Sequence, residues 1–143
     1  MTYSMKYLLQ SLQTDGYERL AVMRRMSDQA LLQVSFGEWD EYLDNGAPSV
    51  KRKPGDTLTG HLSVGLVCDS ETVSRPLSHR QPVPQSPHVE AVVEIFQIMA
   101  DDAVLAASSL QEEAILIAFE SAVPYAVGER ILIQGELKWN EDI

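Results

Sequence analysis

Residues 127–139 alternate between two kinds of side chain with a period of two, and this pattern constrains the fold more than any other in the chain. One face of the segment is polar, and the other is apolar or small. The second face consists of Ile131, Ile133, Gly135, Leu137 and Trp139. Successive side chains of a strand point to opposite faces of its sheet. The segment therefore predicts a half-buried β-strand.

Residues 54–68 repeat this pattern earlier in the chain. Their predicted inner face consists of Leu58, Gly60, Leu62, Val64, Leu66 and Cys68. Both segments follow a glycine and an acid, and both carry an inward glycine two residues before a leucine. A glycine on the inner face lets a strand bend, or lets another backbone come close. We expect Cys68 to be a buried thiol because it belongs to this face.

Most of the remaining chain also predicts strands. Residues 3–13 form the first, and residues 17–36 fit either two strands around a turn at 27–29 or one helix. The hairpin is favoured because it agrees with the strands that follow. Residues 89–99 alternate again, and 103–108 are expected to return antiparallel to them. Residues 114–119 are apolar on both faces, which is typical of a strand covered on both sides.

Residues 69–88 break the pattern with four prolines, at positions 76, 82, 84 and 87. Proline lacks the backbone N–H that a central strand or a helix interior requires. We therefore predict one long proline-rich loop over 69–88. Structureless loops longer than about 15 residues are usually functional or disordered. Arg75, His79 and Arg80 are its candidate partner contacts, and a plain connector is the alternative.

The length of 143 residues fits one domain, spanning 1–143, with a single core. The series of short strands predicts an all-β protein. We expect an antiparallel, closed or partly closed barrel of about five to seven strands, because closure removes exposed strand edges.

The charge of the chain limits its partners. Eleven lysines and arginines oppose 21 acids, which gives a net charge of −10. This charge repels nucleic acid and favours a basic protein partner, although it can also serve solubility alone. No apolar run approaches the roughly 18 residues that a membrane span needs, and the residues after Lys6 are too few for the core of a signal peptide. We therefore expect a cytoplasmic protein with no membrane partner.

No motif in the chain predicts chemistry. A Gly-x-Ser-x-Gly nucleophile elbow, a P-loop, a cysteine pair and a His-x-x-x-His spacing are all missing from the sequence. The three histidines, His61, His79 and His88, stand apart from any such pattern. We predict no catalytic residue, no metal and no cofactor, and hence a protein that is not an enzyme.

Residues 38–44 interleave acids with aromatic side chains and are the strongest candidate for a binding site. The candidate contacts are Glu38, Trp39, Asp40, Glu41, Tyr42 and Asp44. Tryptophan and tyrosine are enriched among interface hot spots, and carboxylates steer a basic partner from a distance. The alternative is that Trp39 and Leu43 pack against the barrel while the acids face solvent.

Two resemblances extend these expectations. The openings Gly55-Asp56-Thr57-Leu58 and Gly128-Glu129-Arg130-Ile131 resemble those of OB-fold-like barrels, which implies an OB-like fold. Nucleic-acid-binding OB modules have basic grooves with stacking aromatics, whereas this chain is acidic.

By type, a small, acidic, cysteine-poor chain is similar to the immunity proteins that neutralise bacterial toxins, whose targets are often basic nucleases. This likeness implies a non-enzymatic inhibitor with a basic protein partner. The alternative is an OB-like module that binds an oligomeric ligand or a peptide on the face around Thr59, His61 and the long loop.

Overall fold

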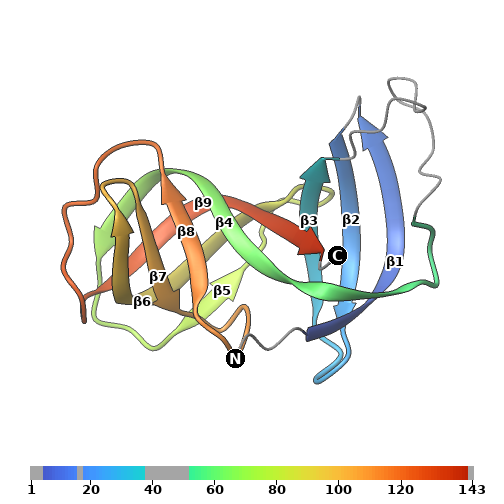
Figure 1. The fold of residues 1–143 in the computed structure, drawn as a ribbon, viewed down its shortest axis with the longest axis horizontal. Helices are drawn as coiled ribbons and strands as arrows, with labels where there is room; N and C mark the ends of the chain where they lie inside the picture. The colour runs from blue at the N-terminus through green and yellow to red at the C-terminus, as the bar shows by residue number, and fades with distance from the viewer. Residues whose placement is uncertain (1–4, 16–17, 38–51, 142–143) are drawn as a thin grey trace.

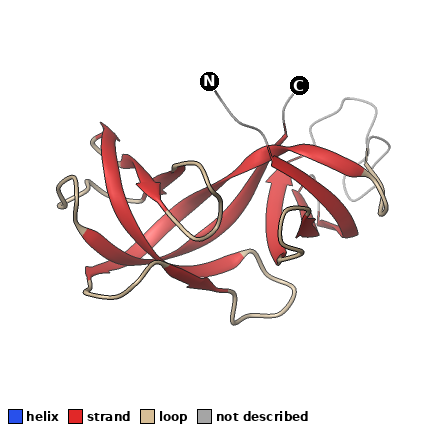
Figure 2. Ribbon diagram, turned by 90° about the horizontal axis from the view of Figure 1, so that it is seen from below, coloured by secondary structure: helices blue, strands red, loops and turns tan. Residues whose placement is uncertain are grey.

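The computed structural model describes residues 5–15, 18–37 and 52–141, and its regular structure is entirely β-strand (Figures 1 and 2). The strands are β1 (Met5–Asp15), β2 (Glu18–Arg25), β3 (Leu31–Gly37), β4 (Thr57–Thr72), β5 (Ser78–Arg80), β6 (His88–Ala100), β7 (Ala103–Ala107), β8 (Ile115–Phe119) and β9 (Arg130–Glu141). The prediction of an all-β protein is confirmed. None of the described residues forms a helix that is long and apolar enough to cross a bilayer.

The strands pair into one ring-like sheet. In sheet order they run β1-β2-β3-β9-β4-β8-β7-β6-β5, and the further pairings β1–β4 and β6–β9 join distant parts of this order. Two long strands, β4 and β9, pair with each other through the middle of the molecule. They separate a lobe formed by β1–β3 from a lobe formed by β5–β8 (Figure 1).

The sheet is mixed, which corrects the prediction of purely antiparallel strands. Strand β3 runs parallel to β9, with which it pairs at Ser35 and Lys138. Strand β4 runs parallel to β8 between Ser63 and Val67. Both parallel pairs involve β4 or β9. Each of these long strands serves two lobes, so it meets neighbours that arrive from different directions along the chain.

The alternation of the closing strand is confirmed. In β9, Ile131, Ile133, Gly135, Leu137 and Trp139 are buried, while Leu132, Gln134, Glu136 and Lys138 between them are partly exposed. The ring of Trp139 packs edge-on against Tyr7 of β1, with 5.0 Å between ring centroids. The alternation of β6 is confirmed from Val89 to Ile95, whereas residues 96–99 are all exposed. Residues 18–37 form the hairpin β2–β3 rather than a helix.

The inner face of β4 differs from the prediction after Gly65. Leu66 has a left-handed backbone with φ of 55°, and the register with β9 shifts between Gly65 and Asp69. A bulge of this kind turns the following side chains to the opposite face. Val67 therefore enters the core, whereas Leu66 is 50% exposed and Cys68 lies at the surface. The expectation of a buried Cys68 is wrong for this reason.

The segment 69–88 contains strands as well as loop, so the prediction of one continuous loop is wrong. Strand β4 continues to Thr72 in register with β9, and β5 pairs with β6. The four prolines lie outside these strands, at 76, 82, 84 and 87. Only residues 73–77 and 81–87 connect the strands, and the second connection holds three of the prolines.

Strand β8 forms where it is predicted, but only one of its faces is covered. Ile115 and Ile117 are fully buried, whereas Leu116 between them is 43% exposed. The prediction of a strand covered on both sides is therefore wrong. Its apolar outer residues remain at the surface because β8 belongs to a single curved sheet, whose inner face alone meets the core.

Candidate functional site

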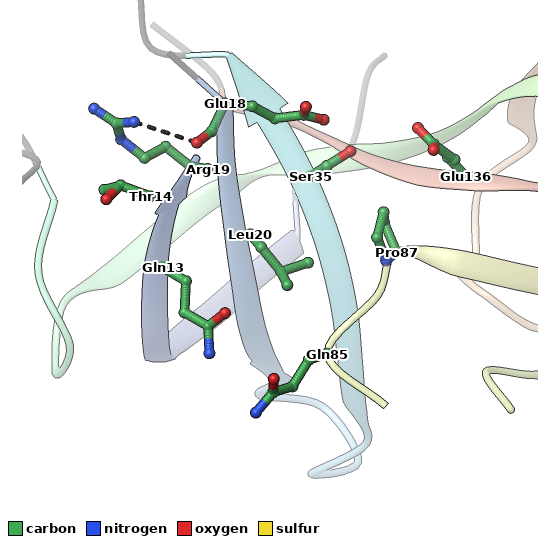
Figure 3. Close-up of a pocket in the computed structure, with 9 residues that line it drawn as sticks. All are labelled: Gln13, Thr14, Glu18, Arg19, Leu20, Ser35, Gln85, Pro87 and Glu136. Carbon is green, nitrogen blue, oxygen red and sulfur yellow. Dashed lines mark hydrogen bonds between the residues drawn. The ribbon is translucent and has the colours of Figure 1, made fainter. Parts of the chain in front are cut away.

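Two pockets lie one after the other along the outer face of β2 and β3, beside residues 78–87. We call them together the β2–β3 groove. The first has a volume of about 340 Å³ and is lined by Gln13, Thr14, Glu18, Arg19, Leu20, Ser35, Gln85, Pro87 and Glu136 (Figure 3). The second has a volume of about 410 Å³ and is lined by Val22, Leu31, Gln33, His79, Arg80 and Gln81.

The groove follows from the register of the hairpin. Leu20 stands opposite Ser35, and Val22 stands opposite Gln33 on the same face of the sheet. The first of these cross-strand pairs lines the first pocket, and the second pair lines the second pocket. The opposite face of the hairpin carries Ala21, Met23 and Val34, which are buried in the core.

The connection 81–87 is attached to the groove by a pair of glutamines. Gln81 Oε1 accepts a hydrogen bond from the backbone N of Gln33 at 2.8 Å, and Gln81 Nε2 donates to the carbonyl of Gln33 at 2.7 Å. The side chain of Gln33 donates to the carbonyl of Val83 at 3.3 Å and accepts from the backbone N of Ser86 at 3.2 Å. The primary amide of Gln81 thus pairs with β3 as a neighbouring strand would.

The far end of this connection is attached to β9. The backbone N of Leu137 donates to the carbonyl of Pro87 at 2.8 Å. Residues 81–87 therefore span the gap where β3 and β9 diverge from their pairing at Ser35 and Lys138. The proline-rich connection has a structural role in addition to its place along the groove.

The first pocket combines two carboxylates with a buried hydroxyl. Glu18 and Glu136 line it from β2 and β9, and both carboxylates extend to the side on which the Ser35 hydroxyl lies (Figure 3). Ser35 is 2% exposed, and its Oγ has no hydrogen-bond partner in the structure. Arg19 is fully buried and directs its guanidinium away from this side, donating to the carbonyl of Glu18 at 3.2 Å.

The second pocket holds a histidine with a serine partner. His79 Nδ1 and Ser109 Oγ are 2.6 Å apart. Burial lowers the pKa of His79, and the nearby Arg25 lowers this pKa further. The lowered pKa of His79 favours its neutral form. Nucleophilic catalysis would also need a third group that orients the base. We interpret the contact as a structural link between β5 and the segment that precedes β8.

A link between the two lobes is centred on Arg25, at the end of β2. Its Nε and Nη2 donate to the two carboxylate oxygens of Asp28 at 2.9 and 2.8 Å, and its Nη1 donates to the carbonyl of Leu110. These hydrogen bonds to Arg25 are the main reason that the pKa of Asp28 is lowered to about 2. Sequence reasoning missed this cluster, because its members are up to 85 positions apart.

The structure brings only some of the predicted binding residues close to one another. Residues 38–44, including Glu38, Trp39, Asp40, Glu41, Tyr42 and Asp44, lie outside the described residues. The residue before them, Gly37, pairs with Glu18 at the rim of the first pocket.

The three predicted loop contacts have separate roles. His79 and Arg80 line the second pocket, and Arg80 forms an ion pair with Glu90. The carbonyl of Arg75 accepts from Arg130 Nη1 at 2.8 Å, which joins the connection 73–77 to β9. Arg75 is not among the lining residues of either pocket of the groove.

Within the described ranges, no three His, Cys, Asp or Glu side chains gather as ligands of a metal ion would. Comparison with known proteins finds no family model, no curated protein and no solved structure that matches this chain.

Proposed function

We propose that this protein is a non-enzymatic binding module for a basic protein partner in the cytoplasm. In type it would be an immunity or inhibitor protein that neutralises a basic toxin such as a nuclease. The observation that carries the proposal is the first pocket of the β2–β3 groove, where Glu18 and Glu136 flank a buried hydroxyl. An open pocket with carboxylates at its rim suits a cationic side chain from another protein.

Two further observations support this function. The net charge of −10 would attract a cationic partner from a distance and speed its association. The predicted contact segment, residues 38–44, begins directly after Gly37, which pairs with Glu18 beside the pocket. In this proposal the acids of that segment steer the partner, Trp39 and Tyr42 anchor it, and the pocket receives one of its basic side chains.

The test is inhibition of purified, basic nuclease toxin domains from bacteria. We expect that one of them binds this protein with one-to-one stoichiometry by calorimetry and loses its nuclease activity in the same proportion. Full nuclease activity of every domain in the panel, at low salt and with the protein in excess, would contradict the proposal.

A second candidate function is an OB-like module that binds a peptide or another oligomeric ligand. The observation that favours it is the length of the groove, in which two pockets of about 340 and 410 Å³ follow each other along β2 and β3. In this proposal the shared strands β4 and β9 would close each lobe as a small OB-like barrel. The ligand-binding face predicted from the sequence differs from this groove, because Thr59 and His61 lie on β4 whereas the connection 81–87 attaches to β3.

A fluorescence titration at low salt separates the two candidates. Single-stranded oligonucleotides and a lysine-rich peptide are added to the protein in parallel. Oligonucleotide binding would favour the OB-like module and contradict the acidic inhibitor, because a chain of charge −10 repels phosphates. Binding of the peptide alone would remove the nucleic-acid form of the second candidate.

A further inference from the structure

We infer that the first pocket of the β2–β3 groove is a lysine-binding site, in which Glu18, Ser35 Oγ and Glu136 accept hydrogen bonds from one ammonium group of the partner. This inference rests on the proposed function and specifies which chemical group the pocket recognises.

The buried hydroxyl is the first reason. Buried polar atoms are nearly always hydrogen-bonded, and a hydroxyl without a partner is a good acceptor for a ligand group that reaches it. Ser35 is 2% exposed, its Oγ has no partner, and it lines a pocket that is open to solvent. A donor that enters the pocket and reaches this oxygen would give it a hydrogen-bond partner. A carbon-only side chain would leave the hydroxyl without a partner.

The neighbouring charges are the second reason, because they select a cation among the possible donors. Glu18 and Glu136 come from β2 and β9, and they lie on either side of Ser35 in Figure 3. An ammonium taken out of water needs a compensating charge and full hydrogen bonding. Two carboxylates would supply the charge, and together with the hydroxyl they offer three acceptors.

The number of acceptors favours lysine over arginine. A lysine ammonium carries three donors on one atom, whereas a guanidinium presents five donors in a flat fork that suits a single carboxylate in bidentate geometry. One hydroxyl between two carboxylates from different strands matches the compact, three-donor group. The four-carbon stem of lysine can lie along the apolar wall that Leu20 and Pro87 provide.

Two cations of the protein itself lie near these acids, and neither occupies the place of the ligand. Lys138 Nζ is 3.8 Å from Glu136 Oε2, beyond hydrogen-bond distance, and its stem lies over Gly65. Lys138 is not among the residues that line the pocket. Arg19 lines the pocket but directs its guanidinium away from Ser35 (Figure 3). The positive charges of Lys138 and Arg19 weaken the attraction of the pocket for a cationic ligand. Hydrogen bonding therefore decides which cationic group the pocket prefers.

The experiment is an NMR titration of the full chain with three small probes at pH 7 and low salt. The probes are Nα-acetyl-lysine-N-methylamide, its arginine counterpart, and the uncharged norleucine counterpart. We expect the lysine probe to shift amide signals of residues 18–20, 35 and 136, and to bind about tenfold more tightly than either other probe, as one or two charged hydrogen bonds allow.

Variants assign the binding to the named acceptors. Ser35→Ala should weaken the lysine probe about tenfold while leaving the protein folded, because the hydroxyl it removes has no partner. The double variant Glu18→Gln with Glu136→Gln should abolish binding. The matched control, Glu112→Gln with Glu120→Gln, also removes two acids, both exposed and outside the pocket, and should leave binding unchanged.

Failure of this inference is distinguishable from failure of the proposed function. Absence of signal shifts, equal binding of the norleucine or arginine probe, or an unchanged affinity in Ser35→Ala would each overturn the lysine site. The proposed inhibition of a basic toxin domain would still hold after those results, provided that the toxin domain contacts another part of this protein. Binding of the lysine probe without any basic protein partner would instead contradict the proposed function and leave the lysine site standing.

Discussion

The side-chain amide of Gln81 forms two hydrogen bonds with the backbone N–H and C=O of Gln33. It takes the place that a neighbouring strand would have along this edge of β3. Both hydrogen bonds are short, at 2.8 and 2.7 Å. Strand β3 pairs with β9 only at Ser35 and Lys138, so its remaining edge would otherwise be open. Open edges invite pairing with other chains, and here a side chain covers the edge.

Replacing Gln81 by alanine should therefore destabilise the protein and expose this edge. We expect the free energy of unfolding to fall by about 1–2 kcal/mol, because the N–H and C=O of Gln33 lose their partner. Urea denaturation measures the loss. The matched control is Val83→Ala, which shortens an exposed side chain of the same connection. Equal stability of the two variants would show that the amide pair contributes nothing.

The pairing of β4 with β9 depends on close backbone contact near the register shift at Gly65, and two glycines there should respond differently to substitution. A Cβ at Gly135 would lie 2.7 Å from the carbonyl O of Gly65 and 2.9 Å from Val64 Cγ1. A Cβ at Gly65 would meet only the flexible end of Lys138, at 2.8 Å from its Cε.

Gly135→Ala should therefore lower the free energy of unfolding by about 1–3 kcal/mol, as overpacking of a core does. Gly65→Ala should cost clearly less, because the lysine side chain can move away. Thermal and urea denaturation of the two variants give the comparison. A Gly135→Ala protein as stable as Gly65→Ala would mean that β4 and β9 have more space between them at Gly135 than the structure shows.

The ion pair of Arg25 and Asp28 predicts a specific dependence of stability on pH. The pKa of Asp28 in the folded protein is about 2, below its ordinary value of 3.8. A carboxyl with a lowered folded pKa contributes stability above its unfolded pKa, and this contribution is lost as the pH falls through the folded pKa. The contribution of Asp28 should thus be complete above about pH 5 and disappear towards pH 2.

The variant Asp28→Asn tests this dependence, because asparagine keeps an oxygen that can accept from the backbone N of Ala30. We expect the native protein to be more stable than the variant at pH 6, and the difference to shrink steadily between pH 5 and pH 2. Urea denaturation at a series of pH values measures both proteins. A difference that is constant over this range would show that the charge of Asp28 is not involved.

Much of the fold could be predicted from local patterns, because alternation of polar and apolar residues is a property of each strand by itself. The burial of Ile131, Ile133 and Leu137 follows from such a pattern, and so does that of Val89 and its neighbours in β6. Local patterns cannot show a bulge. The left-handed backbone at Leu66 shifts the register and moves Cys68 to the surface, although the sequence around it continues to alternate.

Contacts between segments that are far apart in the chain could not be predicted from local patterns either. The sequence shows that residues 54–68 and 127–139 are similar, but not that both strands serve two lobes. The contacts of Arg25 with Leu110 and of His79 with Ser109 join segments far apart in the chain. Ser35 carries no sequence signal at all, because a serine in a polar alternating position is ordinary. Only its burial without a partner marks it.

The most direct test of the account is the association rate with the basic nuclease domain that the inhibition assay identifies, measured against salt concentration by stopped flow. The central claim is that the acids of residues 38–44, which follow Gly37 in the sequence, steer a basic partner. We predict a rate that falls steeply with salt, and a loss of about tenfold or more at low salt in the double variant Glu38→Lys with Asp40→Lys. The control Asp101→Lys with Asp102→Lys, at the turn between β6 and β7, changes the net charge equally and should slow association far less. Equal loss in both variants, or no loss in either, would contradict the account.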